Sequence, residues 1–360
     1  MRTVDFAFRV LRGGAFFGWL QVPQDGTPMI RMDEAAEIKT SLSGVFSPIV
    51  TDSDGNELEP NWLADEIQPV LILDGTEHNL GVFAPASVTP IEDNGIKTLK
   101  IEAYDRCWRV RDTTAEDLIY FASGTNYIDA INTLLTGAGI SAEFATPTSA
   151  TLAEDREGWP VGTSYLAIVN ELLTEINYNP LWINEDGVAI LEPASIPTTE
   201  HIEHMLSDAA DIPGEEPVER MLPQISRETD VYNAPNVFIV VCANPEKSAD
   251  MIAVAENDTP ESPLSTVRRG RRIAQLTHLD NIADQDALQA FANRQRDLSL
   301  ISGESINIET ALLPGYGVND VIGLRYGDLS AVCIDRAWTM ELKVGGTMQH
   351  RLERLVYHLD

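Results

Sequence analysis

His201, Glu203 and His204 are the residues of this chain whose types and spacing come nearest to a metal site. Zincin-type hydrolases use His-Glu-x-x-His, because that spacing places both imidazoles on one helix face beside the glutamate. In this chain the order is His-x-Glu-His, and the run lies in a short acidic segment. We therefore interpret both histidines as surface residues of an acidic loop and predict no metal site.

Asp52 to Asn56 (DSDGN) look like the opening of a calcium-binding loop. The EF-hand needs glycine at its sixth position and a bidentate glutamate at its twelfth. Here glycine follows Asp52 by three residues, so a hairpin or surface turn is the better interpretation. A carboxylate pair for glycoside hydrolysis stays open, because a chain with 56 Asp and Glu always offers some pair at a suitable separation.

The sequence lacks the common catalytic signatures. It contains no G-x-S-x-G nucleophile elbow, no P-loop and no Rossmann glycine fingerprint. Cys107, Cys242 and Cys333 are odd in number and far apart, which argues against a disulfide framework or a zinc knuckle. They are typical of buried structural thiols in a protein made in a reducing cytosol. We predict no catalytic residue, no metal and no cofactor.

One basic cluster, Arg268, Arg269, Arg271 and Arg272 around Gly270, stands out in an acidic sequence. It is too small and isolated to bind nucleic acid. Arginines form bidentate pairs with carboxylates, so the cluster fits an anchor for an acidic surface on a neighbouring subunit. A solvated loop with local ion pairs is the other interpretation, and both stay open.

The charge balance excludes several classes of partner. The chain has 56 Asp and Glu against 25 Lys and Arg, a net charge of −31 over 360 residues. Such a molecule repels nucleic acid, which requires a basic footprint, and it repels anionic membrane surfaces. Because 44% of its residues are hydrophobic, it is not a disordered acidic tail. We expect a folded, soluble protein without stable membrane insertion.

The elements that must position these residues begin with a strand-rich block over residues 1–112. Phe6, Phe8 and Val10 alternate as in a strand, and a hairpin around Gly13-Gly14 fits the apolar start better than a signal peptide does. Asp74-Gly75 and Asn94-Gly95 are strong hairpin turns. Strands are predicted at Ile38–Phe46, Val70–Leu73, Leu80–Phe83 and Thr98–Tyr104. We expect a small antiparallel barrel or sandwich.

The pattern then changes to helical. Residues 113–199 are predicted to form an α+β module, with helices over Tyr127–Leu135 and about Thr163–Asn177 and a hairpin turn at Asp186-Gly187. Residues 200–304 are predicted as an acidic connecting region with a strand at 237–241 and a helix at 283–298. Residues 305–360 return to strands, at Ser305–Ile308, Val321–Leu324, Ala331–Ile334, Met340–Val344 and Arg351–Tyr357. The predicted class is α+β and β-rich, with β domains flanking a helix-containing module.

Several segments resemble siphophage tail-tip and baseplate hub proteins, the gp27-like tail hub family. No single motif is diagnostic, but their order covers about residues 30–330. The segments are Ala36–Phe46, Asn61–Pro69, Ile101–Asp105, Tyr165–Asn179, Leu181–Asp186, Glu228–Val241 (ETDVYNAPNVFIVV), Glu256–Ser265 and Pro314–Leu324 (PGYGVNDVIGL).

The resemblance implies two tube-like antiparallel β-barrel or sandwich domains per chain. It implies that three chains form a pseudo-hexameric ring that joins the tail tube to the tip and lets DNA pass without specific binding. The implied partners are the tail tube, distal tail proteins, and a tape measure protein or tip and fibre proteins. The implied location is the virion, after assembly in the host cytoplasm. Longer relatives carry a peptidoglycan-cleaving domain after the hub, and we expect none here.

Two alternatives stay open: a cell-wall (peptidoglycan) hydrolase of the tail, and a receptor- or carbohydrate-binding tip protein. For the hub, the candidate subunit-interface residues are Arg268, Arg269, Arg271 and Arg272, together with Tyr232 and Asn236 in the turn before a strand. In a conduit, a negative wall would weaken contacts with phosphates. We therefore expect part of the −31 charge to line the channel.

Overall fold

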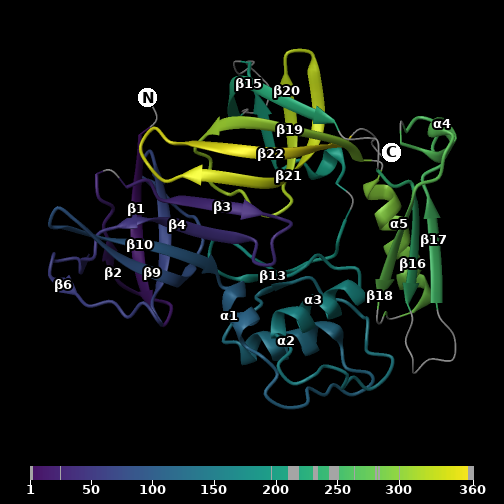
Figure 1. Ribbon diagram of the computed structural model, residues 1–360, viewed down its shortest axis with the longest axis horizontal. Coiled ribbons are helices and arrows are strands. Elements are labelled where there is room, and N and C mark those ends of the chain that lie inside the picture. Colours follow the sequence, from purple (N-terminus) through teal and green to yellow (C-terminus); the bar gives the residue numbers. More distant parts are fainter. Residues whose placement is uncertain are drawn as a thin grey trace.

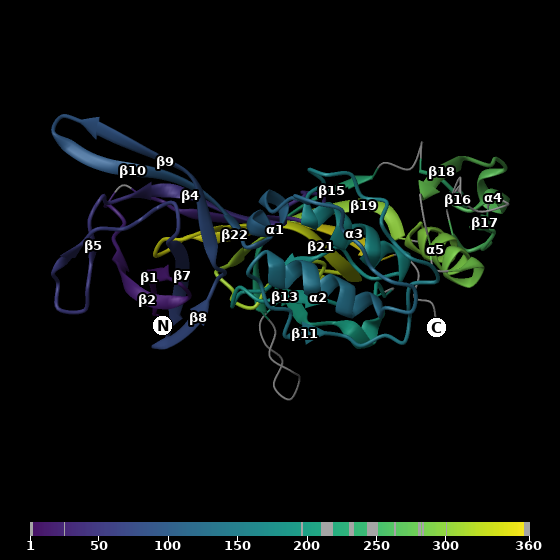
Figure 2. The same cartoon turned by 90° about the horizontal axis from the view of Figure 1, so that it is seen from below.

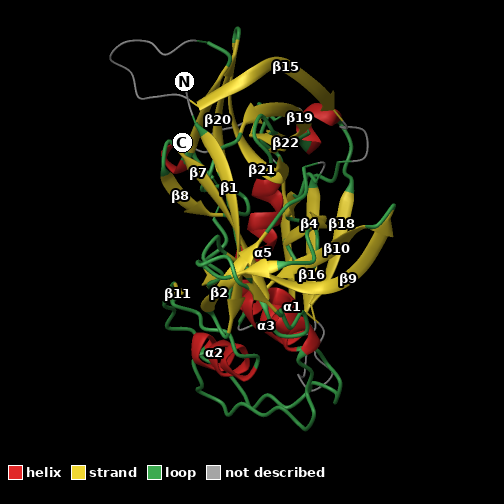
Figure 3. Cartoon of the chain, turned by 90° about the vertical axis from the view of Figure 1, so that its left-hand side faces the viewer, coloured by secondary structure: helices red, strands yellow, loops and turns green. Residues whose placement is uncertain are grey.

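The computed structural model describes residues 3–24, 26–195, 197–209, 219–229, 234–242, 251–262, 264–279, 282, 284–299 and 301–355; the side chains of 229 and 301–303 are not described. Figure 1 shows an N-terminal β domain at the left, a C-terminal β barrel at the top, a helical module below and a small α/β unit at the right. Strands outweigh helices in the molecule (Figure 3). The predicted class, α+β and β-rich, is confirmed.

The N-terminal β domain is a rolled sheet in the order β3-β4-β10-β9-β7-β1-β2-β5-β6, with β8 paired to β7. The end of β2 returns to the end of β4, where the Ser47 amide donates to the Gln21 carbonyl at 2.8 Å. The strands are β1 (Val4–Arg12), β2 (Ala15–Leu20), β3 (Met29–Asp33), β4 (Thr40–Phe46), β5 (Val50–Thr51), β6 (Glu57–Leu58), β7 (Glu66–Leu73), β8 (Thr76–Asn79), β9 (Phe83–Asp93) and β10 (Ile96–Asp105).

The predicted hairpin turns form where the sequence places them. Asp74-Gly75 and Asn94-Gly95 both adopt positive φ, which a two-residue type I′ turn requires at both positions. One strand prediction is wrong, because the hairpin partner of β7 is β8 and not Leu80–Phe83; Phe83 begins β9 and pairs with Ile67 of β7. A two-residue turn sets Thr76 directly opposite Leu73, so pairing begins at once. Figure 2 shows the long β9–β10 hairpin extending away from the body.

The helical module contains α1 (Cys107–Asp112), α2 (Tyr127–Gly137) and α3 (Tyr165–Glu175), with the short strands β11 (Phe144–Ala145), β12 (Trp182–Ile183) and β13 (Ala189–Leu191). Asn126 and Ser164 cap α2 and α3 by accepting backbone N–H bonds. The apolar stripes predicted for both helices pack together in one core. Residues 107–112 belong to this core through Cys107 and Val110, so the module begins before the predicted boundary at 113.

A buried ion pair fixes the module to the N-terminal β domain. The Arg106 guanidinium donates to both carboxylate oxygens of Glu66 on β7, at 3.0 and 2.8 Å, and to the Gly187 carbonyl at 3.0 Å. Glu66 is only 3% exposed, and Arg109 reaches it at 3.1 Å. Gly187 has φ +78°, and a Cβ there would lie 2.8 Å from Val82. Only glycine therefore fits where this turn contacts the first β domain.

The C-terminal barrel is a closed ring of six strands, β20-β14-β15-β19-β22-β21, because β20 also pairs with β21. The strands are β14 (His204–Ser207), β15 (Glu219–Thr229), β19 (Ile301–Ala311), β20 (Val321–Tyr326), β21 (Leu329–Glu341) and β22 (Thr347–Leu355); a 3₁₀ turn, η1 (Thr199–His201), precedes them. The strands predicted at Ala331–Ile334 and Met340–Val344 are one strand, β21. A bulge between Asp335 and Ala337 breaks the alternation that the sequence pattern relies on.

The small α/β unit is inserted between two barrel strands, β15 and β19. It contains β16 (Val237–Cys242), β17 (Met251–Glu256), α4 (Thr266–Arg269), β18 (Ala274–Leu279) and α5 (Gln285–Leu298). The predicted connecting region, 200–304, does not coincide with one structural unit. It includes β14 and β15, which belong to the barrel, as well as the inserted unit. Strands that precede the insertion pair with strands that follow it, which sequence order does not show.

The two β domains share one sheet and one core. β21 of the barrel pairs antiparallel with β3 of the N-terminal domain over five residue pairs, from Ala337↔Asp33 to Glu341↔Met29. Buried residues of both domains, such as Ile30, Met32 and Met340, belong to one hydrophobic cluster. The two domains therefore form a single rigid strand-built body, to which the helical module and the small unit are attached.

Candidate functional site

The predicted interface arginines lie on an exposed loop of the small α/β unit. Arg268 and Arg269 end α4, Gly270 closes it with φ +64°, and Arg271 and Arg272 lead into β18. Arg268, Arg271 and Arg272 are exposed, and Arg269 is half-buried with its guanidinium 2.7 Å from the Ala234 carbonyl. We call residues 266–273 the arginine loop. Part of the ion-pair interpretation holds too, because Arg272 contacts Glu256 at 2.5 Å.

Asn236 shapes the arginine loop from inside. Its side chain is fully buried, donates to the carbonyls of Leu264 and Arg271 at 3.0 Å each, and accepts from the Ile273 amide at 2.7 Å. Any part of Asn236 in an interface is therefore indirect. Tyr232 lies outside the described residues. The interface role of the whole set stays a prediction.

The surface interpretation of the two histidines holds for His201 and is wrong for His204. His201 is exposed at the end of η1. His204 lies on β14, its side chain is 13% exposed, and its ring stacks on Tyr316 with centroids 3.8 Å apart. Alternation along β14 directs it toward the barrel, although the surrounding sequence is acidic.

His204 stands between two carboxylates. Its Nδ1 lies 3.3 Å from Glu219 and its Nε2 lies 3.6 Å from Asp320. Burial alone would lower its pKa, but the hydrogen bonds to Asp320 and Glu219 outweigh burial and raise the pKa to about 10. The Tyr316 hydroxyl also donates to Glu219 at 3.0 Å. His204 is therefore a cation at neutral pH and holds β14 against the residues that follow β19.

A second buried set lies behind Tyr316. His350 contacts Asp335 at 2.6 Å through Nδ1 and Thr310 at 3.0 Å through Nε2. Burial raises the pKa of Asp335, and the contact with His350 offsets this only in part. Within each set the side chains bond to one another, so His204 and His350 both have carboxylate partners inside the barrel. Within the described ranges, no group of His, Cys, Asp and Glu has the geometry of a metal site.

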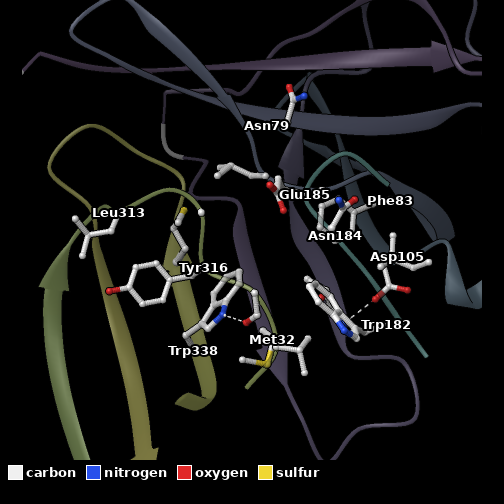
Figure 4. Close-up of a pocket in the computed structure, with 18 residues that line it drawn as sticks. Met32, Asn79, Phe83, Asp105, Trp182, Asn184, Glu185, Leu313, Tyr316 and Trp338 are labelled. Atoms are coloured by element: carbon white, nitrogen blue, oxygen red, sulfur yellow. Dashed lines mark hydrogen bonds between the residues drawn. The ribbon is translucent and has the colours of Figure 1, made fainter. Parts of the chain in front are cut away.

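A pocket where three units meet is too small for a substrate. Figure 4 shows Met32 from the N-terminal domain, Trp182 from the helical module, and Tyr316 and Trp338 from the barrel around it. Its cavity volume of about 30 Å³ is room for about one water molecule. Asp105 at its edge accepts from the amides of Thr40 and Cys107, and burial raises its pKa to about 6. The pocket is therefore a small gap at the packing interface of the three units.

A polar face runs across both β domains on the outer side of the shared sheet. One cross-strand row follows the register through six strands, and side chains directly opposite each other point to the same side. Its members are Glu309 (β19), Gln349 (β22), Thr339 (β21), Arg31 (β3), Ser41 (β4) and Tyr104 (β10), of which Tyr104 packs against the helical module and stacks on Trp108. Figure 1 shows β19, β22, β21 and β3 in this order. The alternate residues, including His350, Met340 and Ile30, are buried.

The neighbouring rows add mostly short polar side chains. They are Ser226, Asn307, Arg351 and Asp33 on one side, and Thr347, Glu341, Met29, Ser43, Glu102 and Ser87 on the other. We call these three rows, with Lys100 beside them on β10, the polar face. Its barrel end is hollowed, with a volume of about 470 Å³. Large apolar side chains are rare on it, so it does not resemble the centre of a protein–protein interface.

The cations of the polar face have acidic neighbours. Arg31 and Arg351 lie 3.3 and 3.6 Å from Asp33, and Lys100 lies 3.0 Å from Glu102. Exposed pairs of this kind contribute at most about 1 kcal/mol to stability. They leave each of the three cations beside a carboxylate. Sequence reasoning named none of these residues, since the face exists only once β3 and β21 are paired.

No described helix is long and apolar enough to cross a lipid bilayer.

No protein-family profile and no curated protein sequence matches the chain. Solved structures of phage tail proteins do match its fold. A tail protein from Neisseria meningitidis MC58 has a TM-score of 0.64 at 13% identity, over 97% of this chain and 96% of that chain. The 43 kDa tail protein of prophage MuSo2 from Shewanella oneidensis has a TM-score of 0.64 at 10% identity, over 98% and 99%.

An E. coli type VI secretion component, described as similar to the bacteriophage T4 tail proteins gp27 and gp5, has a TM-score of 0.51 at 10% identity. It matches 96% of this chain and 76% of that chain. At such identities the likeness establishes the fold and leaves function open. The predicted resemblance to gp27-like tail proteins is confirmed for the fold.

Proposed function

We propose that this chain is the structural hub of a phage tail tip or baseplate. Three copies form a pseudo-hexameric ring that joins the tail tube to the tip and lets DNA pass. The ring lies in the virion, after assembly in the host cytoplasm. Its partners are the tail tube and distal tail proteins on one side, and a tape measure protein or tip and fibre proteins on the other. The fold shared with phage tail proteins supports the tail role.

The observation that carries the proposal is the single sheet shared by two β domains. Pairing of β21 with β3 holds the domains side by side, so each chain supplies two strand-built units to a wall. Three such chains supply six similar β units. A ring of this kind can meet a sixfold tail tube on one side and a threefold tip on the other. Closed rings of identical subunits are the common form of protein assemblies.

The polar face is the part of this body that suits a DNA channel. Phosphates bind proteins mainly through Lys and Arg that replace counterions. On the polar face Arg31 and Arg351 share the carboxylate of Asp33, and Glu309 and Glu341 add further negative charge. A wall of this kind repels DNA weakly and offers no strong site. We assign the polar face to the lumen.

The test combines sedimentation and imaging. We expect the purified chain, alone or mixed with the tail tube protein of the same phage, to give a trimer and rings as wide as a tail tube. A chain that stays monomeric under both conditions contradicts the hub. For the lumen, Ser41→Lys with Ser226→Lys should slow DNA ejection from assembled particles, whereas Glu116→Lys with Asp117→Lys on the helical module should leave it unchanged.

Turnover of purified peptidoglycan separates the hub from a tail-associated hydrolase, and glycan binding by a monomer would favour a receptor-binding tip protein. We expect no turnover. Inside the barrel His350 is paired with Asp335, and His204 is paired with Glu219 and Asp320. Hydrolysis abolished by His204→Gln would contradict the structural assignment.

A further inference from the structure

The two ends of the molecule carry opposite local charge. Residues 47–64, around the β5–β6 hairpin, contain four carboxylates and no Lys or Arg. Asp52 is engaged in the turn, where it accepts from Asn56. Asp54, Glu57 and Glu59 are exposed, and the exposed side chain of Ile49 lies at the start of the same segment. We call residues 47–64 the acidic edge.

The arginine loop is the basic counterpart. Residues 266–273 contain four arginines and no Asp or Glu, in a chain where acids outnumber bases by more than two to one. Its position relative to β17 and β18 is fixed by Arg272, whose guanidinium contacts Glu256 at the end of β17. Along β17, Glu256 alternates with buried Ala255 and points to the same side as Val254. The loop therefore borders that side of the sheet.

An apolar sheet face adjoins the arginine loop. β16 lies between β17 and β18, and α5 covers one face of this sheet through Leu288 and Phe291. On the other face, Ile252 and Val254 of β17 and Leu276 of β18 are 57%, 49% and 56% exposed. Ile239 of β16 stands between Val254 and Leu276 in the register. We call these four residues the apolar sheet face.

The acidic edge and the arginine loop cannot meet within one chain. Figure 1 places β6, and Figure 2 places β5, at one end of the long axis, and both place α4, β16 and β17 at the other. The two surfaces differ from each other, so a contact between them joins copies head to tail. A head-to-tail contact closes into a ring when the rotation per subunit allows it.

We propose that the acidic edge of one copy docks on the arginine loop and apolar sheet face of the next copy. Asp54, Glu57 and Glu59 meet the arginines, and Ile49 contacts the apolar sheet face. A second copy is the occupant because the same chain carries both complementary surfaces at opposite ends. Arginine fits this role through bidentate pairing with carboxylates, and residues in the centre of the contact are apolar. This inference rests on the proposed ring and names the surfaces that close it.

A charge swap tests the contact. Glu57→Lys with Glu59→Lys reverses the acidic edge, and Arg271→Glu with Arg272→Glu reverses the arginine loop. We expect each double variant to weaken self-association by about ten-fold or more, because like charges then face each other. The variant with all four changes should associate nearly as tightly as the native chain. Glu116→Lys with Asp117→Lys, a reversal of two exposed acids elsewhere, is the control and should have no effect.

A disulfide trap extends the test to weak association. Glu57→Cys and Arg271→Cys in one chain should give covalent oligomers on oxidation, whereas Glu116→Cys with Arg271→Cys should not. The native Cys107, Cys242 and Cys333 are buried and do not interfere. A native trimer that both reversals leave intact overturns this contact and leaves the ring standing. A chain that forms neither trimer, ring nor trapped oligomer, even with the tail tube protein, overturns both.

Discussion

Replacing His204 by glutamine removes the cation between Glu219 and Asp320. In the folded protein the pKa of His204 is about 10, against 6.5 for an ordinary histidine. A pKa that rises on folding means that the folded state binds the proton more tightly. The resulting stabilisation is therefore complete below about pH 6.5, falls as the pH rises, and is lost above about pH 10.

The size of the effect follows from the pKa shift and the exposure of the partners. Each pKa unit corresponds to about 1.4 kcal/mol, so the full shift sets an upper limit of about 5 kcal/mol. Glu219 is 32% exposed, and water screens its part of the interaction. We expect His204→Gln to cost about 2–3 kcal/mol near neutral pH and less than about 1 kcal/mol at pH 10.

The loss of stability in His204→Gln is measured by hydrogen exchange of β14 and of residues 313–320. A local measurement is needed because the chain has several folding units, which need not unfold together. Native protein and variant are compared at the same pH, so the intrinsic exchange rate cancels. His201→Gln, an exposed histidine three residues away, is the matched control and should change exchange little at any pH. A difference between native protein and His204→Gln that stays constant from pH 6 to pH 10 would refute a charged His204.

Three further predictions concern buried polar groups. Burial raises the pKa of Asp105 to about 6, so its charge opposes folding at neutral pH. When the pH is lowered from 7.5 to 4, the free energy of unfolding of the native protein should therefore rise by about 2–3 kcal/mol relative to that of Asp105→Asn. Denaturant unfolding at both pH values measures this difference. Arg106→Met leaves buried Glu66 with one cation fewer and should cost about 3 kcal/mol in the same assay. Asn236→Ala removes three buried hydrogen bonds and should speed hydrogen exchange of the arginine loop about 30-fold or more, whereas exposed Asn307→Ala should not.

Local patterns predicted the individual elements well. Asn94-Gly95 and Asp74-Gly75 require positive φ at both positions, so the hairpins follow from two residues each. The helices around Tyr127–Gly137 and Tyr165–Glu175 follow from apolar stripes with polar caps. These signals depend on neighbours within a few residues of each other.

Errors arose where distant segments decide the outcome. The residues of β14 looked like an acidic surface loop, yet pairing with β20 and β15 turns His204 into the barrel. The bulge after Asp335 joins two predicted strands into β21. The turn position of Asn236 gave no sign that Leu264 and Ile273 close over its side chain. In each case the partner lies more than ten residues away in the chain, beyond the reach of a local pattern.

The sequence by itself determined the strand-rich class, the helical module, the acidic balance and the position of the four arginines. These properties are set by composition and by short-range periodicity. Only the tertiary structure decided that β21 pairs with β3, that six strands close a barrel around an inserted unit, and that the acidic edge and arginine loop lie at opposite ends. Hydrogen bonds between strands far apart in the chain carry no local signal, so the polar face and the two ends emerge only when the sheet is assembled.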